Sequence, residues 1–123
     1  MNTFLWVLQI ILAVIYIVSG VMKVTRPKMK LEPQMGFVED FSSRSVKLIG
    51  TAEVLGALGL VLPAATGVAT VLTPLAATGL VILMAGAIVV HRRRGESAAA
   101  VVPAVLLVLS LVVAIGRFGP YPL

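Results

Sequence analysis

The sequence predicts an all-α protein, a single membrane domain built as a bundle of four transmembrane helices. Hydrophobic residues make up 59% of the chain and charged residues 12%, with a mean hydropathy of +1.09. A soluble chain of 123 residues needs far more polar surface than this. Four apolar segments approach the roughly 20 residues that cross a bilayer, and polar stretches rich in Lys and Arg follow the first and the third of them.

The first predicted helix spans residues 4–22 and carries one polar face. Four polar residues recur every seven positions, with a serine and a glycine beside them: Asn2, Gln9, Tyr16, Lys23, Ser19 and Gly20. Residues spaced by seven share a face of an α-helix, so we expect this face to look into the bundle. Two alternatives stay open: Tyr16 sits in plain apolar packing, and Lys23 extends toward the lipid headgroups.

A polar cytoplasmic loop is predicted over residues 24–46. Pro27, Pro33 and Gly36 interrupt any helical pattern there. The apolar side chains within residues 36–41 suit a short helix that rests on the membrane surface or caps the bundle.

The second predicted helix spans residues 47–62, is ended by Pro63, and contains one carboxylic acid, Glu53. One face combines this acid with small residues: Gly50, Glu53, Gly56 and Ala57, with Gly59 and, from the first helix, Gly20 as further packing glycines. Small residues let helices approach closely in lipid. A charged side chain in hydrocarbon costs several kcal/mol, so we expect Glu53 to lie on this packing face rather than in lipid.

The third predicted helix spans residues 68–90, after a tight turn at 64–67, and the fourth spans residues 98–115. Pro74 removes a backbone hydrogen bond from the third helix, and the hydroxyl of Thr73 is expected to compensate. Each helix shows one distinct face: Ala77, Met84, Ala87 and His91 in the third, and Pro103, Ser110 and Arg117 in the fourth.

His91 precedes Arg92, Arg93 and Arg94, a basic run typical of a topogenic anchor at a helix end. It is the single histidine, and the chain has no cysteine. We therefore expect His91 to act as a hydrogen-bonding cap rather than as a metal ligand, and no metal site is predicted.

The charge distribution predicts the orientation in the membrane. Four spans place nine of the ten Lys and Arg residues on one side, and only Arg117 on the other. By the positive-inside rule the loops are cytoplasmic and both termini lie outside, as expected for a multi-pass protein of the bacterial plasma membrane. This placement accounts for the net charge of +5. It leaves no reason to invoke nucleic acid, since no aromatic residues interleave the basic loop for base stacking.

The same topology brings Lys23, Glu53 and His91 into the cytoplasmic half of the bundle. We expect a Glu53–Lys23 pair, extended by His91 or Tyr16. Two interpretations stay open: the pair only fixes helix register, or it forms a polar pocket for a small ligand, a quinone headgroup or a proton. The candidate pocket residues are Glu53, Lys23, His91, Tyr16, Gln9 and Ser19. A single carboxylate gives no support for paired acid–base catalysis.

Several motifs resemble those of the DoxX-like membrane proteins. The stretch SGVMK at residues 19–23 resembles the family's small-Gly-x-x-Lys signature, and Gly50, Glu53 and Gly56 match its Gly-x-x-Glu-x-x-Gly helix. Residues 72–96 resemble its third helix and His-ending turn. The resemblance implies a compact four-helix membrane bundle. It also implies association with quinone-coupled thiosulfate oxidation, or a role as membrane partner in redox and detoxification complexes.

Three functions are compatible with these patterns. The first is a non-enzymatic membrane subunit that binds a partner or a small hydrophobic ligand around Glu53, and this is the function we expect. The alternatives are a quinone-linked oxidoreductase component and a small proton-coupled transporter. Without cysteine the chain cannot run thiol chemistry itself. No cofactor is required; a bound quinone, a membrane or redox partner protein and self-association are left open.

Overall fold

The computed structural model describes residues 2–25 and 43–123, which form four α-helices with no β-strand among them. In chain order the helices are α1 (Asn2–Thr25), α3 (Ser43–Thr66), α4 (Leu72–Arg93) and α5 (Val101–Phe118). Each of the four is long and apolar enough to cross a membrane. The predicted all-α architecture of four membrane-spanning helices is therefore confirmed.

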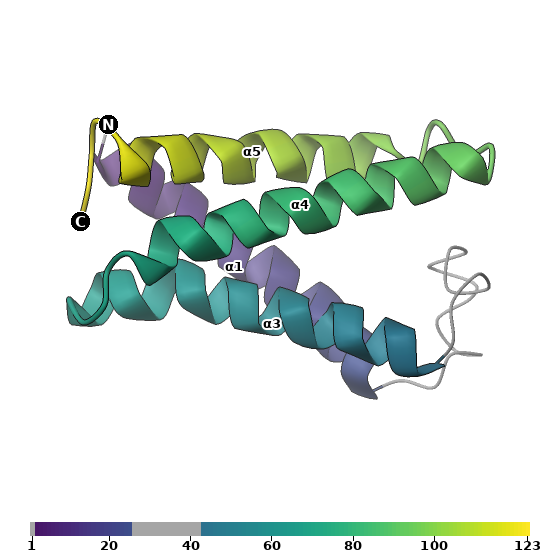
Figure 1. Cartoon of the computed structure of the whole chain (residues 1–123), viewed down its shortest axis with the longest axis horizontal. Coiled ribbons are helices and arrows are strands. Elements are labelled where there is room, and N and C mark those ends of the chain that lie inside the picture. The colour runs from purple at the N-terminus through teal and green to yellow at the C-terminus, as the bar shows by residue number, and fades with distance from the viewer. Residues whose placement is uncertain (1, 26–42) are drawn as a thin grey trace.

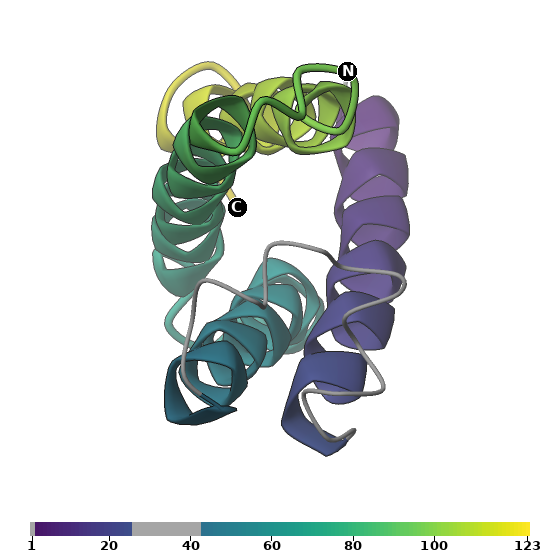
Figure 2. The same ribbon diagram turned by 90° about the vertical axis from the view of Figure 1, so that its right-hand side faces the viewer.

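The helices are arranged as two pairs, α1 with α3 and α4 with α5, and the two pairs are joined mainly by contacts between α3 and α4. Both termini and the turn between α3 and α4 lie at one end of the bundle, here called the termini end (Figure 1). The opposite end, where α1 ends, α3 begins and α4 turns into α5, is called the loop end. The pairs lie together at the termini end and separate toward the loop end, as Figures 1 and 2 show.

All four helices differ in their limits from the predicted segments. α1 runs beyond residues 4–22 at both ends, and α3 begins four residues before the predicted position 47. Both helices thus continue past their apolar segments into polar sequence, so residues 24–25 and 43–46 of the predicted loop are helical. The start of α5 at residue 101 and its end at residue 118 are shifted from the predicted 98–115. The short helix suggested for residues 36–41 lies outside the described residues.

The prediction that Pro63 ends the second helix is wrong, because α3 continues through this proline to Thr66. A proline inside a helix leaves the carbonyl four residues earlier without its amide partner. Here that carbonyl belongs to Gly59, and the Thr73 hydroxyl of α4 donates to it at 2.9 Å. Thr73 thus compensates for Pro63 in the neighbouring helix rather than for Pro74, which lies in the first turn of α4, where an amide has no helical partner to lose.

Gly67 ends α3, and the predicted tight turn moves accordingly to residues 67–71. Its φ of +71° is left-handed, and its amide donates to the carbonyl of Pro63 at 2.9 Å. This is the common way in which a glycine after the last helical residue closes a helix. Ala69 also has a positive φ of 50°, so α4 begins at Leu72 instead of residue 68.

The bundle core consists of apolar side chains from all four helices. Its members that are essentially inaccessible to solvent are Leu12, Tyr16, Ala57, Leu60, Ala77, Leu80 and Val113. Long apolar side chains such as Leu55, Ile82 and Val102 are more than half exposed and face outward. In water such a surface would be unfavourable, whereas in a bilayer it is the surface that lipid requires.

Candidate functional site

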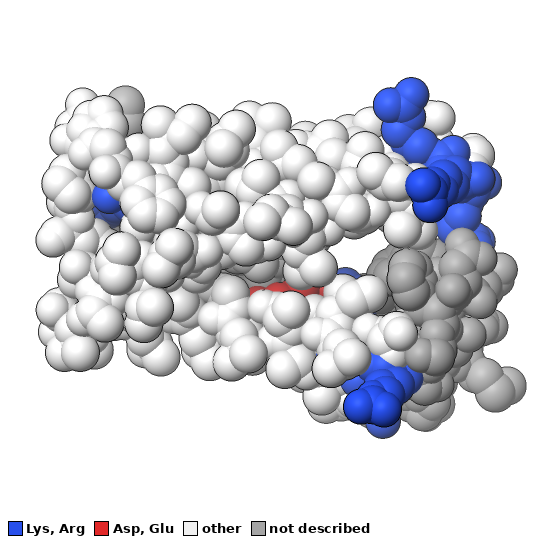
Figure 3. Space-filling view, viewed as in Figure 1, with Lys and Arg blue, Asp and Glu red and all other residues white. Residues whose placement is uncertain are grey.

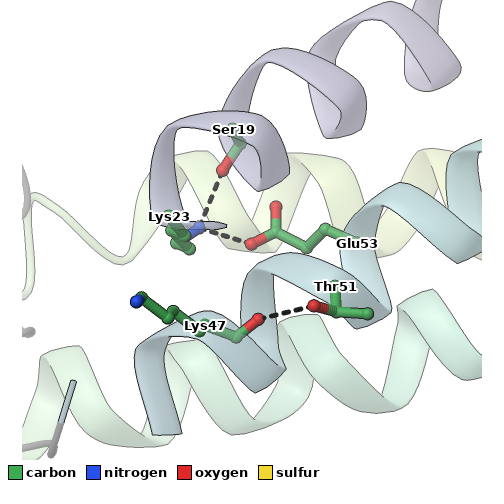
Figure 4. A network of polar contacts seen from close by, with 5 residues as sticks. All are labelled: Ser19, Lys23, Lys47, Thr51 and Glu53. Atoms are coloured by element: carbon green, nitrogen blue, oxygen red, sulfur yellow. Dashed lines mark hydrogen bonds and ion pairs between the residues drawn. The ribbon is translucent and has the colours of Figure 1, made fainter. Parts of the chain in front are cut away.

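Lys23 of α1 and Glu53 of α3 form a buried ion pair between the ammonium Nζ and the carboxylate Oε1 (Figure 4). Only 7% of Lys23 and 1% of Glu53 is exposed. The Lys23 ammonium also donates to the Ser19 hydroxyl at 2.7 Å. Lys23 therefore turns into the bundle instead of extending to the headgroups, and its charge compensates the carboxylate that the apolar sequence around Glu53 would otherwise isolate.

Two glycines bring the backbones of α1 and α3 close enough for this pair. A Cβ added to Gly20 would lie 2.6 Å from the carbonyl oxygen of Gly50, and one added to Gly50 would lie 2.7 Å from the Cβ of Lys23. Neither position has room for a side chain. Gly56 and Gly59 serve the α3–α4 contact in the same way, against Leu80 and Ala76.

A cavity of about 360 Å³ lies beside the ion pair, where the two helix pairs separate. Tyr16, Ser19, Lys23, Glu53 and His91 contribute its polar lining. The remaining lining is almost entirely apolar and comes from α1, α3, α4 and α5. Figure 3 shows a hollow between α3 and α4 toward the loop end, where a small part of an acidic residue is visible in red.

Tyr16 faces the same cavity but does not extend the ion pair. Its hydroxyl lies 2.9 Å from the Ser110 hydroxyl of α5, and both side chains are completely buried. This hydrogen bond joins α1 to α5 near the middle of the bundle. The predicted inward face of α1 is thus used for two different inter-helix contacts, one to α3 and one to α5.

The chain matches the family model of the DoxX-like family over residues 7–113. It belongs to the DoxX-like family. Among curated proteins and among solved structures, nothing matches the chain significantly. The motif residues Lys23, Gly50 and Glu53 of this DoxX-like protein meet at one place, the contact between α1 and α3 beside the cavity.

His91 of the DoxX-like protein lies at the cavity wall, and its ring contacts Glu96 in the turn after α4. Its Nδ1 atom is 3.2 Å from Glu96 Oε1, to which the Arg94 Nε donates at 3.1 Å. The extension of the Glu53–Lys23 pair by His91 stays a prediction, and the contact that the structure describes for this ring is the one to Glu96. The hydrogen bond from Arg94, followed by the one from His91, holds the pKa of the Glu96 carboxyl below its usual range.

The turn after α4 explains why His91 points to Glu96. The Glu96 amide donates to the His91 carbonyl at 2.8 Å, and the Gly95 amide donates to the Arg92 carbonyl at 3.1 Å. With Gly95 at a φ of +72°, this is a Schellman motif, which folds the chain back over the last helical turn. The sequence signal for this turn was Gly95 directly after the basic run. We interpreted the basic run only as a membrane anchor and did not use the glycine.

Gln9 lies away from the candidate pocket, toward the termini end. Its amide nitrogen donates to the Leu60 carbonyl of α3 at 2.6 Å, and its amide oxygen accepts from Arg117 Nε at 2.8 Å. Arg117, only 3% exposed, also donates to Asn2 Oδ1 at 2.6 Å and to the Tyr121 carbonyl at 3.0 Å. The sequence placed Arg117 on a shared face of its helix but gave no partner for it.

The described residues contain no group of three or more His, Asp or Glu side chains placed to hold a metal ion. The polar groups beside the cavity are instead suited to hydrogen bonding: a carboxylate that accepts, an ammonium that donates, and a hydroxyl that does both. The site can therefore recognise a polar group at the end of an otherwise apolar molecule.

Proposed function

We propose that this DoxX-like protein is a non-catalytic membrane subunit that binds a small hydrophobic ligand, by its polar end, in the cavity beside Glu53. The observation that carries the proposal is a buried ion pair in the wall of an otherwise apolar cavity. Small-molecule sites typically have such a composition and occupy about 300–1,000 Å³. If the ion pair only fixed helix register, it would need no cavity beside it.

The direct test is native mass spectrometry of the protein extracted from its own membrane, compared with two phenylalanine variants. Ala87 lines the cavity, so Ala87→Phe fills it and should lose the retained ligand mass. Ala85, on the exposed side of the same helix, gives the matched control Ala85→Phe, which should keep it. The proposal would be contradicted if the wild-type protein retained no small molecule, or if the wild type and both variants retained the same amount of it. The same spectra report a bound partner protein or a second copy.

A quinone-linked role is the second candidate. The Lys23 ammonium and the Ser19 hydroxyl are donors at the cavity wall, and the carbonyl oxygens of a quinone headgroup are acceptors. A quinone reduction assay in membranes separates this role from simple binding. Reduction that depends on the protein and is lost in Ala87→Phe would support it, whereas binding without any electron transfer would leave the non-catalytic subunit as the function.

A proton-coupled transporter has less support. The described core side chains Leu12, Leu60 and Leu80 are at most 1% exposed and fill the bundle between the cavity and the termini end. A proton path would have to cross this apolar layer. Proton flux measured in vesicles that contain the purified protein should therefore equal that of empty vesicles.

We further propose that the protein lies in a bacterial plasma membrane with its loop end in the cytoplasm. The described basic residues of α3 and α4 cluster at the loop end, as Figure 3 shows, which is the distribution that the positive-inside rule requires. Because the chain lacks cysteine, Ser97→Cys and Leu123→Cys can report orientation. A membrane-impermeant maleimide added to intact cells should label Leu123→Cys only; the reverse pattern would overturn the orientation.

A further inference from the structure

A groove on the lipid-facing side continues the cavity along the seam between α3 and α4. It has a volume of about 350 Å³ and a floor of small residues, among them Ala52, Gly56 and Gly79. Leu55 and Ile82 form its rims and are 63% and 69% exposed. Leu83 lines both the groove and the cavity. The two spaces are therefore adjacent parts of one surface that runs from Glu53 toward lipid.

The two glycines of α4 along this seam leave space free. A Cβ added at Gly79, in the groove, or at Gly86, in the cavity lining, would meet no atom within 4 Å. The two positions are seven residues apart and thus share a face of the helix. The α4 backbone therefore leaves the seam open at these two positions, about 10 Å apart along the helix, with Leu83 between them in the chain.

The polar end of this surface restricts the charge of what can bind. Among the described residues, the Lys23 ammonium and the Glu53 carboxylate compensate each other there, and a charged headgroup would add a net charge to this pair inside the membrane. Lys23 uses Oε1 of Glu53; the other carboxylate oxygen accepts no hydrogen bond from the described residues and points away from Lys23 (Figure 4). A neutral head with a hydroxyl group can donate to that oxygen.

We propose that the ligand is a neutral amphiphile with one hydrocarbon chain, whose hydroxyl-bearing head meets Glu53 in the cavity and whose chain lies in the α3–α4 groove. This inference rests on the proposed function and adds the class of ligand and a second subsite. Because the groove and the cavity adjoin at Leu83, a chain anchored in the cavity can reach both spaces, which favours a lipid chain over a second protein copy. Charged amphiphiles and short polar molecules are excluded from tight binding.

The test compares two phenols, para-ethylphenol and para-dodecylphenol, on the protein in lipid nanodiscs. Gly79→Leu places a side chain in the groove without touching the cavity, and Ala85→Leu adds the same side chain on the exposed side of α4 as the control. We expect the affinity for the dodecyl compound to fall about tenfold in Gly79→Leu, the change that corresponds to 1.4 kcal/mol. The affinity for the ethyl compound should stay within twofold, and Ala85→Leu should change neither.

The outcomes separate this inference from the proposed function. If neither phenol binds the wild-type protein, the proposed ligand site itself fails and the inference with it. If both phenols bind, but Gly79→Leu leaves the affinity for the dodecyl compound unchanged or lowers both affinities equally, the ligand site in the cavity is supported. The groove is then not the subsite for its chain, and the inference is overturned. If the wild-type protein self-associates and Gly79→Leu abolishes this self-association while both phenols still bind, the groove is the binding site of a second copy and the inference is overturned.

Discussion

At the scale of single residues, the decisive contact is the ion pair between Glu53 and Lys23. Its two members are 30 positions apart in the chain, yet each was identifiable as an inward-facing residue from its helical spacing. Topology then predicted that the two form a pair, but it gave no partner for other polar side chains such as Gln9 and Arg117. His91 was expected near Glu53 because both lie in the same half of the bundle, and its contact with Glu96 could not be foreseen because it depends on the Schellman turn at Gly95.

The ion pair predicts a strongly non-additive pair of substitutions. Glu53→Leu leaves the Lys23 ammonium buried without its carboxylate and should destabilise the protein by roughly 3–5 kcal/mol. The double variant Lys23→Met/Glu53→Leu removes both charges and should lie within about 1 kcal/mol of the wild type. Reversible unfolding by sodium dodecyl sulfate in mixed micelles measures both. A double variant as unstable as the single one would contradict this account of the pair.

Glu96 gives a pH-dependent prediction outside the membrane-spanning segments. Because Arg94 and His91 stabilise its ionised form, the folded pKa lies below the unfolded one. The resulting stabilisation of the turn is complete above the ordinary glutamate pKa of about 4.3 and is lost as the pH falls through the folded pKa. Carbon-13 NMR titration should show a lowered Glu96 pKa that moves upward in Arg94→Ala. An identical titration curve in that variant would refute the assignment of cause.

At the scale of helices, the close contact between α1 and α3 depends on glycines, which have no side chain to hold the two backbones apart. The sequence identified Gly20 and Gly50 as packing glycines, and the structure shows that their backbones approach each other directly. Helix limits were predicted less well, because apolarity marks the membrane-embedded part of a helix and not its end. α3 shows this at both ends: it starts in the polar sequence before residue 47 and runs through Pro63.

Replacing glycines of opposite environment by alanine should have opposite effects. In Gly50→Ala the new Cβ would meet Gly20 O and Lys23 Cβ, both at 2.7 Å, so α1 and α3 must separate at a cost of about 1–3 kcal/mol. In Gly79→Ala it meets nothing within 4 Å, and the higher helix propensity should stabilise by roughly 0.5–1 kcal/mol. The free energy of unfolding of each variant, measured in micelles, tests this. If both substitutions change it in the same direction, the α1–α3 contact is less close than described.

The hydrogen bond from Thr73 to Gly59 predicts a coupling with Pro63. Thr73→Val leaves the Gly59 carbonyl without this donor and should destabilise by about 0.5–2 kcal/mol, the range found for side-chain hydrogen bonds between membrane helices. Pro63→Ala restores a backbone amide that can reach the same carbonyl. The cost of Thr73→Val should therefore shrink in the Pro63→Ala background. A double-mutant cycle with no coupling energy would show that Thr73 does not compensate for the proline.

At the scale of the whole molecule, polar contacts hold the bundle together unevenly. The termini end is joined by Arg117 and Gln9, which connect α1, α3 and α5. Toward the loop end the two helix pairs separate, and the cavity lies in the space between them. The sequence predicted the four helices and the half of the bundle in which Glu53 lies. The sequence could not predict this separation. It results from how the two helix pairs pack against each other, and it leaves no periodic pattern in the sequence of any one helix.

The measurement that tests the central claim most directly is carbon-13 NMR of glutamate-labelled protein in nanodiscs, titrated with para-dodecylphenol. The account predicts that the carboxyl resonance of Glu53 shifts as the ligand binds, while that of Glu96, in the turn after α4, stays in place and serves as an internal control. If native mass spectrometry shows the phenol bound to the same sample but the Glu53 resonance does not move, the ion pair is not part of a ligand site.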